Sequence, residues 1–373
     1  MFHGLSVNIN WAADRMSEYI NNSIFISIVK IVINIIIFGL IGACCFCSSA
    51  DRFSTESMAS LYSEKIKGIS FVSINSIATL QNFRSAKDNS RCTWVSLMPF
   101  GFCKANENTV QFGNKQQWEG ERSDGIKKYI DSAKACGLKI MLKPQIWFPN
   151  SFSGDFKCST NEDWKVFEDS YWKYIKVFAE IAEKKKVDLF CVGTELRRFI
   201  AERPVFWEAM IDSIREYYSG QLTYASNWDN YQEIPFWNRL DLIGIDAYFP
   251  LADGPTATKH ELKESFRSLA VELEGFSINA DHQKIIFTEY GWRSSTGDLR
   301  KPWQSNTNHN VDLMIQKVIY EAFFEELWDE SWFKGGFIWK WFPDHESSGG
   351  ELDSRFTPQN KPAQKVIHDN YGR

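Results

Sequence analysis

Short apolar runs alternate with amphipathic segments between residues 67 and 371, and this alternation limits the fold more than any other feature of the sequence. The runs are rich in β-branched and aromatic residues, which favour strands, and they lie at residues 67–74, 93–99, 138–142, 187–192, 222–225, 240–245, 284–287 and 335–338. Helices are predicted at residues 123–136, 161–185, 204–218, 259–274, 310–328 and 361–371. Eight strands alternating with helices predict a parallel sheet of the α/β class, closed into a (β/α)8 TIM barrel.

The connection between residues 225 and 240 is the weakest part of this prediction. It is near the minimum length for a crossover between parallel strands, so its helix must be very short. The alternative is an open doubly wound sheet that binds its ligand where the strand order reverses. We favour the barrel because the polar and aromatic candidates follow the strands' C-terminal ends, the face on which barrel enzymes carry their chemistry.

Two glutamates follow predicted strands at this face. Glu195 ends a Val-Gly-Thr-Glu sequence after the fourth strand, and Glu289 lies in Lys-Ile-Ile-Phe-Thr-Glu-Tyr-Gly-Trp at the seventh. They are 94 residues apart, which fits three strand–helix units of about 31 residues each in a barrel of ordinary size. Cleavage of a glycosidic bond requires two carboxyl groups that flank the scissile oxygen. The pair therefore suggests a sugar-cleaving enzyme, although a single glutamate at a strand end is more often solvated or salt-bridged.

Composition excludes several other functions. The net charge is −5, without a sustained basic run, so no nucleic-acid partner is expected. The six histidines do not pair at metal-ligand spacing, and no nucleotide-binding or serine-hydrolase motif occurs, so neither a metal nor another cofactor is expected. Aromatic residues make up 15% of the chain and include 15 tryptophans, more than a core requires, which suggests a surface for sugar rings.

The segments 192–195 and 287–292 resemble the acid/base and nucleophile strands of the clan A glycoside hydrolases. Within that clan the chain is most similar to glycoside hydrolase family 113, the endo-β-mannanases. The resemblance runs from about Gly68 to the C-terminus and includes residues 143–147, 226–228, 246–250 and 356–363. One departure is Thr194, because much of the clan has asparagine before the acid/base glutamate.

The resemblance implies a retaining glycoside hydrolase that acts on a β-linked oligo- or polysaccharide, most specifically an endo-β-1,4-mannanase. Glu289 would be the nucleophile and Glu195 the general acid and then base. Tyr248 or Lys143 could keep Glu289 charged, and at least one of Trp339 and Trp341 should form the floor of the sugar site. The candidate substrate-binding residues are Lys143, Trp147, Asn227, Trp228, Tyr248, Trp292, Trp339 and Trp341.

Three alternatives remain open. Several of the tryptophans could simply cap the barrel core. The same machinery could act on another β-glycan or carry out transglycosylation. A different class of protein, a non-catalytic surface lipoprotein, could bind glycans through its tryptophans. The sequence does not distinguish mannose from glucose as the substrate sugar, because this specificity depends on how the protein contacts one axial hydroxyl.

The N-terminal part predicts export. Residues 24–43 are almost entirely apolar, and Ile-Gly-Ala-Cys at 41–44 resembles a bacterial lipoprotein box. We expect a signal peptide or membrane anchor at residues 1–43, lipidation of Cys44, a tether at 44–66 and one catalytic domain at 67–373. The protein would then be a monomer held at the membrane of the cell envelope, with its catalytic domain periplasmic or extracellular.

Overall fold

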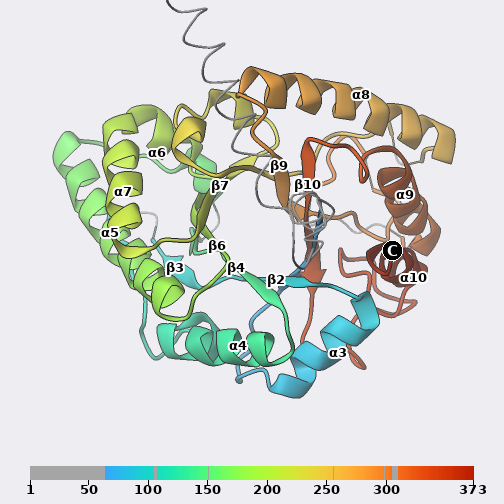
Figure 1. Cartoon of the computed structure of the whole chain (residues 1–373), viewed down its shortest axis with the longest axis horizontal. Coiled ribbons are helices and arrows are strands. Elements are labelled where there is room, and N and C mark those ends of the chain that lie inside the picture. The colour runs from blue at the N-terminus through green and yellow to red at the C-terminus, as the bar shows by residue number, and fades with distance from the viewer. Residues whose placement is uncertain (1–63, 105–106, 150, 255, 298, 305–309) are drawn as a thin grey trace, which may run out of the picture. The chain divides into compact units, whose positions relative to one another are not determined.

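The computed structural model describes residues 64–373, except 105–106, 150, 255, 298 and 305–309 (Figure 1). Eight parallel strands close into a barrel in the order β1-β10-β9-β8-β7-β6-β4-β2. Their bounds are Ile66–Phe71 (β1), Trp94–Leu97 (β2), Lys139–Leu142 (β4), Leu189–Thr194 (β6), Gln221–Asn227 (β7), Leu242–Asp246 (β8), Ile285–Tyr290 (β9) and Phe333–Trp341 (β10). This confirms the predicted (β/α)8 barrel and excludes the open sheet.

Helices surround the barrel (Figure 1). They are α3 (Leu80–Ser90), α4 (Ser123–Ala135), α5 (Asn161–Lys184), α6 (Arg197–Glu202), α7 (Pro204–Tyr217), α8 (Lys259–Asn279), α9 (Leu313–Glu326) and α10 (Pro362–Tyr371). Two of the longest start at a threonine capping box, with Thr160 before α5 and Thr258 before α8. Helix α3 is absent from the sequence prediction because its only buried apolar residues, Phe83 and Ala86, are too few to show a helical period.

The short connection between β7 and β8 contains no α-helix. It consists of two single 3₁₀ turns, η3 (Tyr231–Glu233) and η4 (Trp237–Arg239). The indole N–H of Trp237 donates to the Tyr231 carbonyl at 2.8 Å, which ties the two turns together. The prediction of a very short crossover is thus confirmed.

The side chains inside the barrel change from apolar to polar along the barrel axis. Seven side chains from seven strands form an apolar layer: Ile66, Trp94, Met141, Leu189, Leu242, Ile286 and Phe337. Strands of a barrel fill their own interior in this way, so the barrel is a packed core and not a pore. Towards the C-terminal ends of the strands the interior becomes polar, with buried Lys143, Asp246 and Thr288.

Two short strands extend this end of the barrel. Strand β3 (Phe100–Phe102) pairs in parallel with β5 (Gln145–Trp147), directly after β2 and β4. The hydroxyl of Tyr174 on α5 donates to the Gln145 carbonyl at 2.9 Å and lies 2.8 Å from the Pro99 carbonyl. The small sheet therefore has a fixed position, and Gln145 enters the site from it.

The described residues between 64 and 373 belong to one compact unit. The signal or anchor at 1–43, the lipidated Cys44 and most of the tether lie outside the described residues, so these assignments and the envelope location remain predictions. Within residues 64–373, apart from the gaps given above, no helix has the length and apolar character needed to span a membrane.

Candidate active site

Glu289 lies near the C-terminal end of β9, opposite Asp246 of β8 in the barrel register. Its side chain is almost buried, and its carboxylate accepts hydrogen bonds from three neighbours. Lys143 Nζ is 2.5 Å from Oε1, Gln145 Nε2 is 3.2 Å from the same oxygen, and the Tyr248 hydroxyl is 2.8 Å from Oε2. Three donors on two oxygens fix the orientation of this carboxylate.

Lys143 joins the two buried carboxylates. Its Nζ is 2.9 and 3.1 Å from the carboxylate oxygens of Asp246, and the Thr288 hydroxyl donates to Asp246 Oδ1 at 2.7 Å. Burial alone lowers the pKa of Lys143, but attraction to Asp246 and Glu289 outweighs it and raises the pKa above its ordinary value. Burial and repulsion by Glu289 raise the pKa of Asp246 to about 7. One permanent cation thus holds two acidic groups inside the barrel.

A glycine directly after β9 lets β9 and β10 approach closely. A Cβ on Gly291 would lie only 2.4 Å from the Trp339 carbonyl oxygen, so any larger residue would push the two strand ends apart. The Gly in the Glu-Tyr-Gly-Trp sequence therefore positions Glu289 relative to the Trp339 side of the cavity.

Glu195 follows β6 in a left-handed backbone conformation, with φ of 51°. Its own N–H donates to the Ala225 carbonyl at 2.8 Å, and the next N–H, of Leu196, donates to the Tyr224 hydroxyl at 2.7 Å. Burial, followed by repulsion from Asp246 and Glu289, raises the pKa of Glu195 well above that of an ordinary glutamate. Its carboxyl group therefore retains its proton to higher pH than a free glutamate does.

Both glutamates line one cavity of about 590 Å³ at the C-terminal end of the barrel. Its wall contains four of the predicted substrate-binding residues: Asn227, Trp228, Tyr248 and Trp339. Lys143 is fully buried and touches Glu289, so it orients that carboxylate and does not face a sugar. The remaining lining residues are Phe152, Arg197, Asp229, Trp303 and Phe356.

Three predicted sugar-binding tryptophans lie elsewhere. Trp292 is 3% exposed and packs edge-on against Phe266 and Tyr320 in the core, and Trp341 is fully buried with its ring stacked on His345. These two positions correct the prediction, because side chains without accessible surface cannot stack on a sugar. Trp147 is 56% exposed but does not line the cavity.

Sequence reasoning missed Asp246 and Gln145, which complete the contacts around Lys143 and Glu289. It also missed Trp303 and Phe356 in the cavity wall. The sequence did contain a signal for Asp246, a carboxylate that directly ends an apolar strand, as Glu289 does. Among the described residues, no group of three or more His, Cys, Asp or Glu side chains is arranged to hold a metal ion.

Comparisons with known proteins agree with this fold. The family model of Glycoside Hydrolase Family 113 matches residues 73–361. The GH113 β-mannanase AaManA from Alicyclobacillus acidocaldarius is similar in structure, with 24% identity and a TM-score of 0.73, over 83% of this chain and 97% of that one. A GH113 β-1,4-mannanase has 23% identity and a TM-score of 0.70, over 83% and 99% of the two chains.

A more distant similarity extends to the β-glucuronidase of Ruminococcus gnavus, with 13% identity and a TM-score of 0.54, over 83% of this chain and 50% of that one. No curated protein sequence matches this chain.

A closed (β/α)8 barrel with two glutamates in one aromatic cavity at its C-terminal end, together with the family match, defines a glycoside hydrolase. The matched segment covers most of the sequence and every barrel strand except β1, which ends at Phe71. The chain belongs to Glycoside Hydrolase Family 113.

Proposed function

We propose that this protein is a retaining glycoside hydrolase that cleaves β-linked polysaccharide, most specifically an endo-β-1,4-mannanase. Glu289 is the nucleophile and Glu195 the acid/base. The observation that carries the proposal is the contrast between two carboxyl groups in one cavity. Glu289 accepts hydrogen bonds from a lysine, an amide and a tyrosine, whereas burial and nearby negative charge make Glu195 hold its proton. Such divided environments assign base and acid.

In the first step Glu195 donates its proton to the glycosidic oxygen, and that oxygen leaves with the bonding electrons. Glu289 attacks the anomeric carbon and forms a glycosyl ester with the enzyme. In the second step Glu195, now ionised, takes a proton from water, the water oxygen attacks the same carbon, and the ester bond breaks. Two inversions leave the configuration of the sugar unchanged, and Glu195 is protonated again.

Lys143 and Tyr248 act on the leaving carboxylate of Glu289. Both contacts are strongest when Glu289 is charged, so they stabilise it before attack and again when the ester is hydrolysed. Trp339 faces the cavity with part of its indole exposed, which offers a flat surface for the C–H face of a pyranose.

The substrate assignment is tested by measuring reducing ends released from mannan, β-glucan and xylan. The family membership and the mannanases of similar structure support β-1,4-mannan as the preferred polymer. We expect mannan to give the highest kcat/KM, with the first products retaining the β configuration in NMR spectra. Equal or higher activity on glucan or xylan would move the assignment to another β-glycan, and tight binding without hydrolysis of any polymer would indicate a glycan-binding protein.

The raised pKa of Glu195 predicts a pH dependence of activity. The general acid must be protonated, so kcat/KM is maintained below the pKa of Glu195 and falls as the pH rises through it. Because this pKa lies well above that of an ordinary glutamate, the decline is expected clearly above pH 4.5. The Glu195→Gln variant, assayed with an aryl glycoside whose leaving group needs no protonation, should lose this alkaline limb. If the alkaline decline of kcat/KM is unchanged in that variant, the group that titrates is not Glu195.

A further inference from the structure

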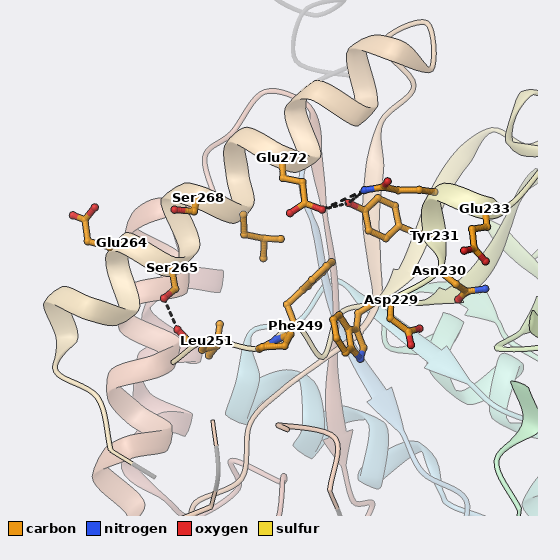
Figure 2. Close-up of a pocket in the computed structure, with 14 residues that line it drawn as sticks. Asp229, Asn230, Tyr231, Glu233, Phe249, Leu251, Glu264, Ser265, Ser268 and Glu272 are labelled. Atoms are coloured by element: carbon orange, nitrogen blue, oxygen red, sulfur yellow. Dashed lines mark hydrogen bonds between the residues drawn. The ribbon is translucent and has the colours of Figure 1, made fainter. Parts of the chain in front are cut away.

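A second cavity, of about 740 Å³, adjoins the catalytic cavity and is open along one side of α8 (Figure 2). Trp228 and Asp229 line both cavities, so the two share a wall. We call the second one the α8 groove. Its other walls come from η3, from residues 249–251 after β8, and from one face of α8.

The α8 groove has fixed walls. Glu264, Ser268 and Glu272 recur every fourth residue and therefore lie on one face of α8. The Tyr231 hydroxyl donates to Glu272 Oε1 at 2.6 Å, which ties η3 to the helix. Nearer the N-terminus of α8, the Ser265 hydroxyl donates to the Leu251 carbonyl (Figure 2). These two hydrogen bonds fix the walls of the groove to α8.

A row of aromatic rings runs from the catalytic cavity into the groove. Trp303, in the wall of the catalytic cavity, stacks on Trp228 with centroids 5.1 Å apart and planes at 26°. Trp228 meets the edge of Phe249 at 6.0 Å, and Phe249 meets Tyr231 at 6.1 Å. Trp303 is 41% exposed and Trp228 is half-buried, so both present ring surface at the junction of the two cavities.

The polar lining of the groove favours a neutral, hydroxyl-rich ligand. Its carboxylates, from Asp229, Glu233, Glu264 and Glu272, can accept hydrogen bonds from hydroxyl groups, and among the described residues no lysine or arginine lines it. An anionic polymer would be repelled by this wall. Ser268 is exposed and lies between Glu264 and Glu272 on the α8 face, where it carries the shortest side chain of the three (Figure 2).

We propose that the α8 groove binds distal units of a neutral β-linked glycan whose scissile bond lies between Glu195 and Glu289, and that the chain crosses from one cavity to the other over Trp228. This inference rests on the proposed function and specifies it. An enzyme with binding sites beyond the catalytic cavity gains affinity from units that do not react, so it prefers long chains and cleaves within them.

The test fills the groove and leaves the catalytic cavity intact. Ser268→Trp places an indole in the groove from an exposed helical position. Ile278→Trp adds the same ring to the same helix at a 51% exposed position roughly 15 Å further along its axis, outside the groove. For the wild-type protein and both variants, kcat/KM is measured on mannobiose, mannohexaose and linear mannan. Thermal unfolding checks that the folds are equally stable.

We expect Ser268→Trp to lower kcat/KM about tenfold on mannohexaose and mannan, the loss of one good contact, and to leave mannobiose unchanged. Ile278→Trp should match the wild type on all three. If kcat/KM depends on the length of the substrate in the same way in Ser268→Trp and in the wild type, the groove assignment is overturned. The hydrolase assignment is unaffected by that result. The groove assignment is also overturned if Ser268→Trp lowers kcat/KM on mannobiose as strongly as on mannohexaose.

A binding measurement separates this inference from the proposed function. Calorimetric titration of mannohexaose into Glu289→Ala protein, with and without Ser268→Trp, requires no turnover. About tenfold weaker binding in the double variant supports the groove even without measured hydrolysis. Equal affinity overturns it, and the absence of binding in both proteins overturns the groove together with the mannan assignment.

Discussion

Replacing Glu289 with alanine should lower kcat on mannan by roughly 10⁴- to 10⁶-fold, the scale seen when a covalent nucleophile is removed. The change removes the atom that bonds to the anomeric carbon, whereas the cavity wall and Glu195 stay in place. Lys143 retains Asp246 as a partner at 2.9 Å, so the folded state keeps a paired cation. The measurement is release of reducing ends together with a thermal unfolding curve. Activity within tenfold of the wild type would refute the nucleophile assignment.

Azide, a small external nucleophile, should distinguish the roles of Glu289 and Glu195. With an activated aryl β-glycoside, azide should occupy the space left in Glu289→Ala, attack the anomeric carbon once and yield an α-glycosyl azide. In Glu195→Ala the nucleophile is intact, so azide should attack the glycosyl–enzyme ester and yield the β-glycosyl azide. The two products differ in their NMR coupling constants. The opposite pattern of products would exchange the roles of Glu195 and Glu289.

Replacing Lys143 with methionine should destabilise the protein by about 3–5 kcal/mol, because it removes one member of a buried ionic cluster. Lys143 is fully buried and contacts both Asp246 and Glu289, so its loss leaves two carboxylates facing each other without a cation. Asp246, whose pKa is already raised to about 7, then takes up a proton, and Glu289 loses the hydrogen bond from Lys143 that orients its carboxylate. Both the free energy of unfolding, measured with urea, and kcat should fall.

The double variant Lys143→Met with Asp246→Asn is the matched control. It removes the cation together with one carboxylate, so the repulsion that destabilises the single variant disappears. We expect recovery of much of the lost unfolding free energy but not of kcat, because Glu289 still lacks its 2.5 Å contact with Lys143. Wild-type kcat in either variant would show that Lys143 does not position the nucleophile.

Local sequence was sufficient for the elements and the two glutamates. Strands such as Ile285–Tyr290 are short, apolar and rich in β-branched and aromatic residues, so a few consecutive positions reveal them. A parallel barrel then brings all their C-terminal ends to one face, which is why Glu195 and Glu289 could be assigned to one site although 94 residues separate them. Helix α3 escaped detection because it buries too few apolar residues.

The strand pattern did not predict which tryptophans line the cavity and which are buried. Trp339 and Trp341 are two residues apart on β10, and regular alternation would place both on one face. Between its pairs Ile69–Ile338 and Phe71–Trp341, however, β10 has one more residue than β1. This bulge turns the strand, so that Trp339 lines the cavity while Trp341 is buried against His345.

The barrel, the family resemblance and the two glutamates could be predicted from the sequence alone, because each depends on short stretches of chain and on the general geometry of parallel barrels. The surroundings of the two glutamates, in contrast, follow from the three-dimensional fold. The cluster of Lys143, Asp246 and Glu289 joins three strands that are distant in sequence, and its charges depend on burial that no local pattern records. The α8 groove likewise exists only because a short crossover and a long helix meet beside Trp228.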